Sequence, residues 1–286
     1  MTPLVCGVMV THEPSPRVID VLDSFRHQVA HVVIVDNASS TECHRLLANI
    51  CDADPALTLI SNDTNQWLAK ALNQGSSWAR SQGYEFVLMM NYGNLLSPNA
   101  VATMLQFFAD PELGRVGSVN PRVVIGQRPE ETAWEVAADE SLPVTAGCLV
   151  SSDAIAVSGG QRETFLIDMI DYDFGFRLRT HGYRSLTAPS VTIACELGRT
   201  TRRRFGWKHC NVENYSPLRR YYYARNGLVL LREVRDIDLA WDYGYFLLAS
   251  LGKILLYEDQ KAIKLLMTLR GLRDALRGHL GPFASE

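Results

Sequence analysis

Three aspartates lie close together at the start of a segment, residues 169–182, that has the spacing of a helix. They are Asp168, Asp171 and Asp173, and on a continuous helix Asp168 and Asp171 share a face while Asp173 points elsewhere. A carboxylate in a binding site can accept a proton as a general base. Acids at a helix start can also simply complement the helix dipole. The residues alone leave both interpretations open.

A basic run is the second chemical feature of the sequence. Residues 199–204 read Arg-Thr-Thr-Arg-Arg-Arg, and arginine forks suit phosphate oxygens. A solvated loop, or a patch that meets anionic lipid, explains such a run about equally well. Arg219, Arg220 and Arg225 are further cations downstream.

The elements that must position these residues alternate along the first hundred residues. Short apolar runs predict buried strands at 5–10, 31–35, 58–60 and 86–90, and helical spacing marks 17–28 and 68–80. This order predicts βαβ units and a mainly parallel sheet. Ligands bind at the carboxyl ends of such strands, and here those ends carry Thr11-His12-Glu13, Asp36-Asn37 and Asn91-Tyr92-Gly93-Asn94.

The rest of the chain predicts more strands and then a helical tail. A helix is expected from Pro98 to about Phe108 and another over 152–157, with strands at 116–119, 122–125, 145–150 and 191–194. A helix-rich tail follows from Pro217 to Gly278. The change in composition near Gly206 predicts two parts, residues 1–206 and 207–286.

Composition excludes several classes of protein. The chain has 286 residues, 47% hydrophobic and 21% charged, which is typical of an ordered globular protein. A net charge of −3 gives no argument for nucleic-acid binding. The six cysteines form no CxxC pair and lack zinc-site spacing. Scattered thiols, no recognisable secretion signal and no apolar run long enough to span a bilayer predict a cytoplasmic protein.

Five segments, in order, resemble the inverting GT-A glycosyltransferases of family 2, and among them the bacterial rhamnosyltransferases of surface polysaccharide synthesis. The segments are Val8-Met-Val-Thr-His-Glu-Pro14, Val33-Ile-Val-Asp-Asn-Ala-Ser39, Asn65 with Ala69-Lys-Ala-Leu-Asn-Gln-Gly75, Phe165-Leu-Ile-Asp-Met-Ile-Asp-Tyr-Asp173 with Arg177, and Ser216-Pro-Leu-Arg-Arg-Tyr-Tyr-Tyr-Ala-Arg-Asn226. The resemblance implies an α/β, GT-A (Rossmann-like) fold: a mainly parallel sheet flanked by helices, with a helical C-terminal tail. It also implies transfer of a deoxysugar, most simply L-rhamnose from dTDP-rhamnose, to a saccharide acceptor with inversion.

The same resemblance assigns roles to individual residues. Asp171 stands where the family has its general base, Asp168 and Arg225 fall in the acceptor region, and the diphosphate falls to Arg199, Arg202, Arg203 and Arg204. The nucleotide-sugar residues are Thr11, Glu13, Asp36, Asn37, Asn65, Trp67, Lys70, Asn73, Asn91 and Gly147. Several of these have plainer interpretations, because Asp and Asn commonly form turns and caps at strand ends and a strand glycine often marks a bulge.

Three departures fall in the predicted donor site. The family's metal-binding D-x-D is replaced by Asn91-Tyr92-Gly93-Asn94, so a divalent cation lacks its usual carboxylate ligands and no metal cofactor is predicted. Cys195-Glu196 occupies a stretch that often holds a histidine, and Trp67 replaces a small residue. Either protein cations neutralise the diphosphate, or the chain is a catalytically degenerate homologue that binds or assembles with an active transferase.

The tail carries two apolar segments. Residues 239–257 are too polar to span a membrane but apolar enough to lie at a membrane face or in a subunit contact. Residues 261–277 have a basic amphipathic pattern. Helices packed against the catalytic domain or against a second copy explain both equally well, whereas a lipid-linked acceptor, which the resemblance suggests, would favour the membrane.

Overall fold

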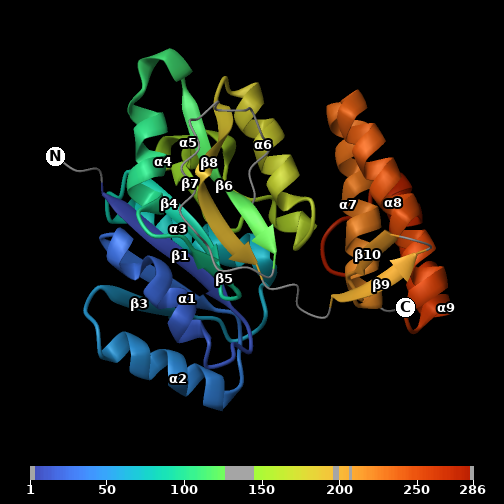
Figure 1. The fold of residues 1–286 in the computed structure, drawn as a ribbon, viewed down its shortest axis with the longest axis horizontal. Coiled ribbons are helices and arrows are strands. Elements are labelled where there is room, and N and C mark those ends of the chain that lie inside the picture. Colours follow the sequence, from blue (N-terminus) through green and yellow to red (C-terminus); the bar gives the residue numbers. More distant parts are fainter. Residues whose placement is uncertain (1–3, 126–144, 196–199, 206–207, 284–286) are drawn as a thin grey trace. The chain divides into compact units, whose positions relative to one another are not determined.

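A computed structural model describes residues 4–125, 145–195, 200–205 and 208–283. Contacts divide the chain into two compact units (Figure 1). Unit 1 comprises residues 1–162 and 171–196, and unit 2 comprises residues 163–170 and 197–286. This division differs from the predicted one at residue 206, because 163–170 groups with the tail; Gly206 itself lies outside the described residues.

Unit 1 is built on an eight-stranded sheet in the order β3-β2-β1-β4-β7-β6-β8-β5. The strands are β1 (Val5–Thr11), β2 (His31–Asp36), β3 (Leu57–Ser61), β4 (Phe86–Asn91), β5 (Asn94–Leu96), β6 (Val116–Ile125), β7 (Cys148–Ser151) and β8 (Arg184–Cys195). β1 pairs in parallel with β2 and β4, β2 pairs in parallel with β3, and β6 pairs in parallel with β8. β7 is antiparallel to both β4 and β6, and β5 is antiparallel to β8. The predicted mainly parallel sheet is therefore confirmed.

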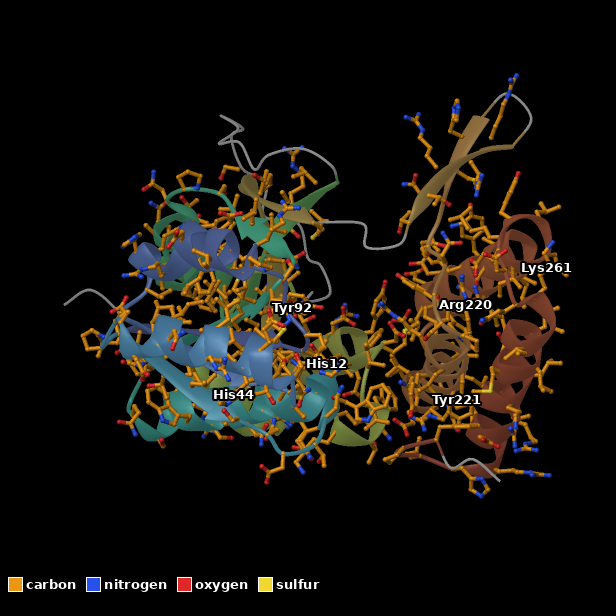
Figure 2. All side chains as sticks on the ribbon, turned by 90° about the horizontal axis from the view of Figure 1, so that it is seen from below. His12, His44, Tyr92, Arg220, Tyr221 and Lys261 are labelled. Atoms are coloured by element: carbon orange, nitrogen blue, oxygen red, sulfur yellow. The ribbon has the colours of Figure 1, made fainter. Side chains whose placement is uncertain are left out.

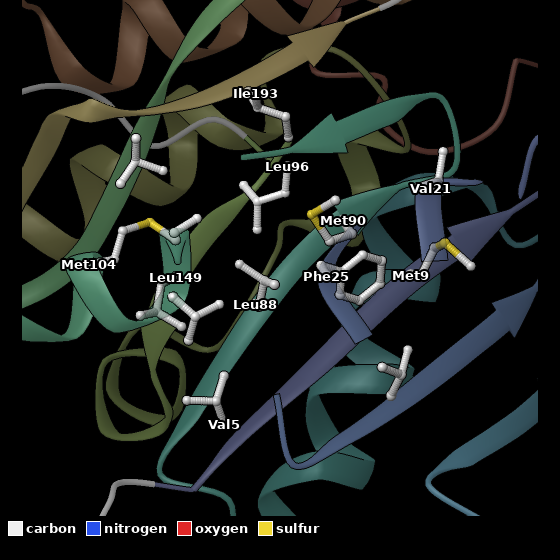
Figure 3. Close-up of a cluster of buried hydrophobic side chains, with 14 of the residues drawn as sticks. Val5, Met9, Val21, Phe25, Leu88, Met90, Leu96, Met104, Leu149 and Ile193 are labelled. Atoms are coloured by element: carbon white, nitrogen blue, oxygen red, sulfur yellow. The ribbon is translucent and has the colours of Figure 1, made fainter. Parts of the chain in front are cut away.

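Helices cover both faces of this sheet. They are α1 (Val18–Phe25), α2 (Thr41–Asp52), α3 (Trp67–Ser81), α4 (Ala100–Ala109), α5 (Ser152–Ser158) and α6 (Ile170–Thr180), with short 3-10 turns at Arg26–Gln28, Pro111–Leu113 and Glu163–Phe165. One face packs Met9, Ile34 and Leu88 with α1 and α4 into the core drawn in Figure 3. On the other face α3 approaches closely at Gly75, where a Cβ would lie 2.3 Å from the Val8 side chain.

Several elements depart from the sequence expectations: β5 was not predicted, and β8 begins at Arg184, well before the expected strand at 191–194. β6 is one continuous strand, whereas the sequence predicts two separate strands at 116–119 and 122–125. A register shift in its pairing with β8, between Pro121 and Arg122, lies where the two predicted strands meet. α2 was not predicted, because only Leu47 of its side chains is buried and its apolar stripe is narrow. The arginine run, predicted as a loop, forms β9 (Thr201–Phe205), which pairs antiparallel with β10 (Lys208–Val212).

Unit 2 joins this hairpin to three helices, as the predicted helix-rich tail requires. They are α7 (Pro217–Val234), α8 (Ile237–Tyr257) and α9 (Lys261–Arg277). α9 approaches α7 closely, since a Cβ at Gly271 would lie 2.4 Å from the Tyr221 carbonyl oxygen. Among the described residues, no helix is both long enough and apolar enough to cross a membrane.

Candidate functional site

The carboxyl ends of β1 and β2 carry a buried polar network. Thr11 and Asp36 are register partners, and the Thr11 hydroxyl donates to Asp36 Oδ1 at 3.2 Å. Ser39 Oγ donates to the same oxygen at 2.5 Å. Thr11 and Asp36 are almost fully buried. The network fixes the Asp36 carboxylate at the strand end, where the sequence predicts the nucleotide.

Asn37 ties this strand end to the chain that leads into α3. Its side-chain oxygen accepts from the backbone N–H of Gln66 at 2.9 Å and from Asn62 Nδ2 at 3.2 Å. Its Nδ2 donates to the Trp67 carbonyl oxygen at 3.1 Å, and His12 Nδ1 lies 3.0 Å from the Asn37 carbonyl oxygen. These contacts give Asn37 a clear part in shaping the loop.

Glu13 caps α2. Its carboxylate accepts from the Ser40 backbone N–H at 2.6 Å and from the Ser40 hydroxyl at 2.9 Å. These hydrogen bonds, the one from the Ser40 side chain first, lower the pKa of Glu13 below its ordinary value. Glu13 therefore stays ionised at the exposed rim of the strand ends.

The predicted residues on α3 separate into two groups. At the helix start, Asn65 Oδ1 accepts from the Trp67 backbone N–H at 2.8 Å, and Trp67 has a φ of 64°. Lys70 is exposed one turn later. Asn73 instead joins α3 to the turn after α5, because its side chain exchanges hydrogen bonds with the Gln161 backbone at 2.7 and 2.8 Å. Its described contacts are those of a packing residue.

The ends of β4 and β7 meet at the same edge of the sheet. Asn91 is the last residue of β4, and Tyr92 after it is 38% exposed near His12 (Figure 2). The Gly147 N–H donates to the Met89 carbonyl oxygen at 2.8 Å. Gly147 has a φ of 74°, and a Cβ there would lie 2.7 Å from Ile193, so both conformation and packing require glycine.

Asp171 lies at this same edge. It is the second residue of α6, is half-buried, and accepts at Oδ1 from the Tyr172 N–H at 3.1 Å. Burial raises the pKa of the Cys148 thiol, and the nearby charge of Asp171 raises it further. Cys148 begins β7 opposite Met89, so the structure brings Asp171 close to the strand ends of β4 and β7.

Asp173 has a structural environment instead. Its buried carboxylate accepts from Arg177 Nε at 2.8 Å and from Arg162 at 3.3 Å. Arg177 also donates to the Gly160 carbonyl oxygen at 2.7 Å. This ion pair locks α6 to the turn after α5, which accounts for Arg177 in the sequence motif.

In unit 2, α7 holds the segment that contains Asp168. Arg219 donates to both carboxylate oxygens of Asp168, at 3.0 to 3.2 Å. Asn226 Nδ2 donates to the carbonyl oxygens of Phe165, Ile167 and Asp168 at 2.8 to 3.1 Å.

Arg225 of α7 also helps to hold the segment that contains Asp168. Its guanidinium is 1% exposed and donates to the carbonyl oxygens of Thr164 and Gly281. It also lies over the rings of Tyr221 and Tyr222. Such burial argues against a direct contact between Arg225 and an acceptor, so its predicted role is not carried further.

The predicted diphosphate residues lie in unit 2 as well. Arg202, Arg203 and Arg204 are exposed on β9, while Arg199 lies outside the described residues. Tyr257 donates its hydroxyl to the Arg204 carbonyl oxygen at 2.9 Å, which anchors the hairpin to the end of α8. The three side chains thus stand on a paired strand.

The residues after β4 do not fit a divalent cation. Asn91 and Tyr92 offer an amide and a phenol, and Asn94 is buried in β5 opposite Cys195. None of these supplies the carboxylate oxygens that Mg²⁺ or Mn²⁺ prefers beside a diphosphate. Among the described residues, His, Cys, Asp and Glu form no cluster of three or more that could hold a metal.

Sequence reasoning missed several residues that shape these regions. Ser39 has no role of its own among the predicted site residues, although its position three residues after Asp36 is the spacing of a side chain that returns to a strand-end carboxylate. Arg219 and Asn226 gave no local signal of their contacts with 163–170, because their partners lie more than fifty residues away in the chain.

This sheet, with the predicted site residues at its carboxyl edge and helices on both faces, is the fold of GT-A glycosyltransferases. The chain aligns over 95% of its length with residues 1–349 of TarS from S. aureus, covering 80% of that chain at a TM-score of 0.63 and 12% identity. It also aligns over 96% of its length with GalNAc-T7, solved with UDP, GalNAc and Mn²⁺, at a TM-score of 0.61 and 14% identity. The chain spans only 56% of that protein's length.

Residues 7–143 match the model of glycosyl transferase family 2, and this match, together with the relative described next, shows that the protein is a glycosyltransferase. A curated relative is the dTDP-rhamnosyl transferase RfbF of Shigella flexneri. It is 21% identical over 292 residues, which cover 93% of this chain and 95% of the relative. The expectations of a GT-A fold and of a glycosyltransferase are therefore confirmed.

Proposed function

We propose that the protein transfers a deoxysugar, L-rhamnose from dTDP-rhamnose, to a saccharide acceptor with inversion, as a step in the synthesis of an O-antigen-like polysaccharide. The similarity to RfbF over almost the whole of both chains supports the donor. The observation that carries the chemistry is that Asp171 lies near enough to Cys148 for its charge to raise the pKa of that thiol, at the edge where β4 ends and β7 begins.

In the proposed reaction Asp171 is the general base. Its carboxylate accepts the proton of an acceptor hydroxyl as that oxygen bonds to the anomeric carbon. The bond from the anomeric carbon to the diphosphate oxygen breaks on the opposite side, and dTDP leaves with the electron pair. Attack opposite the leaving group inverts the anomeric configuration.

The nucleotide half of the donor is assigned to the ends of β1 and β2. Asp36, held by Thr11 and Ser39, offers a fixed carboxylate to hydroxyl or N–H donors of the nucleoside. Asn37 shapes the loop beside it, and Trp67 offers an aromatic side chain at the start of α3. Glu13, Asn65, Lys70, Asn91 and Gly147 remain candidates for further contacts at this edge.

In this proposal arginine side chains neutralise the negative charge that develops on the leaving diphosphate. Because the residues after β4 lack carboxylates, a metal held there is not part of the proposal. Arg202, Arg203 and Arg204 are exposed, and guanidinium groups match phosphate oxygens in pairs. Arg199 completes the predicted set. Asp168, paired with Arg219, remains a candidate for acceptor contacts.

We place this activity in the cytoplasm. All six cysteines lie among the described residues and are free thiols, as expected in a reducing compartment.

The test is turnover of dTDP-rhamnose by purified protein, followed as transfer or as slow donor hydrolysis. Asp171→Asn keeps the size of the side chain but removes the base, so kcat should fall about 10²- to 10⁴-fold while dTDP binding by calorimetry is unchanged. Asp153→Asn, an exposed aspartate on α5, is the matched control and should leave kcat unaltered. Unchanged kcat in Asp171→Asn would show that another group is the base.

The same assay in the presence of EDTA tests whether a metal ion is needed to neutralise the diphosphate. Turnover should be the same with EDTA as with added Mg²⁺ or Mn²⁺. A requirement for metal would mean that other side chains supply ligands. If no nucleotide sugar binds at all, the alternative of a catalytically degenerate homologue that partners an active transferase takes its place.

A further inference from the structure

Unit 2 exposes large apolar side chains along one side of α8. Ile237, Trp241, Tyr245 and Leu248 are 69%, 75%, 68% and 70% exposed. Their spacing of four, four and three residues places them on one face of the helix, and Leu255 two turns later continues it. Burying side chains of this kind is the main source of favourable free energy in folding and association. This stripe therefore has the character of a contact surface.

The next helix extends the apolar surface and adds positive charge. Ile263, Leu266, Leu269 and Leu276 of α9 are more than half exposed. Arg270, Arg273 and Arg277 alternate with them along the helix. The one acid of α9, Asp274, is buried and accepts from the Tyr221 hydroxyl at 2.9 Å and from Arg273 Nε at 3.0 Å. The exposed surface of α9 thus combines leucines with arginines and carries no carboxylate.

The two helices follow each other in the chain and are tied together at their junction. They pack against each other beside α7 (Figure 1), and only three residues connect them. Within that connection Glu258 is buried and accepts from Arg220 at 2.5 Å and from Lys264 at 2.8 Å. Figure 2 labels Arg220 of α7 and Lys261, the first residue of α9. We call the exposed apolar side chains the α8–α9 face: Ile237, Trp241, Tyr245, Leu248, Leu255, Leu256, Ile263, Leu266, Leu269 and Leu276.

Charge is distributed unevenly between the two units. Unit 2 contains sixteen Lys and Arg against eleven Asp and Glu, a net formal charge of +5. Unit 1 contains twelve against twenty, a net charge of −8. The overall charge of −3 therefore conceals a basic unit, and that unit carries the α8–α9 face.

We propose that the α8–α9 face binds the surface of a membrane that contains anionic lipid, with the helices lying in the plane of the interface. Leucines would enter the acyl boundary, Trp241 and Tyr245 would sit at headgroup level, and the arginines would meet lipid phosphates. The exposed acids of α8, Asp238 and Asp242, lie in its first two turns, and α8 and α9 run in opposite directions, so these acids are at the same end of the helix pair as Arg273 and Arg277. This inference goes beyond glycosyl transfer and does not depend on the donor.

A second copy of the chain is the less favourable occupant. In a symmetric dimer the same patch meets itself, so the arginines of α9 in the two copies would gather across the contact, and the only exposed acids on the two helices to oppose them are Asp238 and Asp242 of α8. An anionic surface instead neutralises the same arginines. The positive charge of the α9 arginines therefore favours an anionic membrane surface over a second copy of the chain as the partner of the α8–α9 face.

Vesicle flotation of the full-length protein, without nucleotide sugar, tests the proposal. Vesicles of phosphatidylcholine with one third phosphatidylglycerol should bind the protein at least tenfold more tightly than phosphatidylcholine alone. The double substitution Trp241→Ser/Leu248→Ser should reduce that binding at least tenfold. The matched control is Ile19→Ser/Val157→Ser, which replaces two exposed apolar residues of unit 1, 42% and 49% exposed, and should bind like the parent protein.

Thermal melts of both double variants establish that they remain folded. Equal binding to the two kinds of vesicle, or flotation that survives Trp241→Ser/Leu248→Ser, would overturn the proposal. So would a stable dimer in sedimentation that the same double substitution converts to a monomer, since the face would then be a subunit contact. Because no donor is present, each of these results leaves the proposed rhamnosyl transfer to be judged by its own assay.

Discussion

At the scale of single residues, Trp67 is the most unusual position at the strand ends. Its φ of 64° lies in the left-handed region, which bulky L-residues rarely adopt. The conformation is held from both sides, because the Trp67 N–H donates to Asn65 and its carbonyl oxygen accepts from Asn37. A backbone cost of about 1 to 2 kcal/mol is therefore maintained where the donor is expected to bind.

Comparing Trp67→Gly with Trp67→Ala isolates this backbone cost. Both changes remove the indole ring, but only glycine tolerates a positive φ freely. The glycine variant should be more stable to urea than the alanine variant by about 1 kcal/mol. Equal stability of the two variants would mean that residue 67 does not hold a left-handed backbone in solution.

At the level of helices and strands, side chains of α7 hold segment 163–170 in place through hydrogen bonds, and we call this arrangement the clamp. In this segment Leu166, Asp168 and Met169 all have positive φ, so the chain needs external donors to hold it. Arg219, Arg225 and Asn226 supply them. The same segment leads directly into α6, whose second residue is Asp171.

Replacement of Asn226 by leucine tests the clamp. It would leave three carbonyl oxygens without their buried N–H donor, so the free energy of unfolding should fall by roughly 2 to 4 kcal/mol. Asn211→Leu, at an exposed position of β10, should change it by less than about 0.5 kcal/mol. Denaturation followed by circular dichroism measures both, and equal effects would contradict the clamp.

At the scale of the whole molecule, the chain crosses between units more than once. Residues 163–170 belong to unit 2 although unit 1 surrounds them in sequence. Phe165 and Ile170 are buried, and the backbone of the segment is bonded to α7. The two parts are therefore not separable at a single point.

Truncation at residue 206, the boundary expected from composition, should for that reason fail to give a stable protein. Without α7 the segment 163–170 loses the donors to its carbonyl oxygens and exposes Phe165. Limited proteolysis should cut the truncated protein within this segment and leave the full-length protein intact there. A truncated protein that resists cleavage and melts at the parent temperature would contradict this expectation.

The alternation of β1, α1, β2, β3, α3 and β4, the strand-end positions of Thr11, Asp36 and Asn91, and the kind of enzyme could all be predicted from the sequence. These depend on local periodicity and on short motifs, which neighbouring residues carry. Only the tertiary structure decided that Arg225 and Asn226 are internal donors, that the arginine run is a strand, and that 163–170 belongs with the tail. Each of these depends on partners that are distant in the chain or on which side of a helix faces water. The local spacing of residues in the sequence reveals neither the distant partners nor the orientation of the helix.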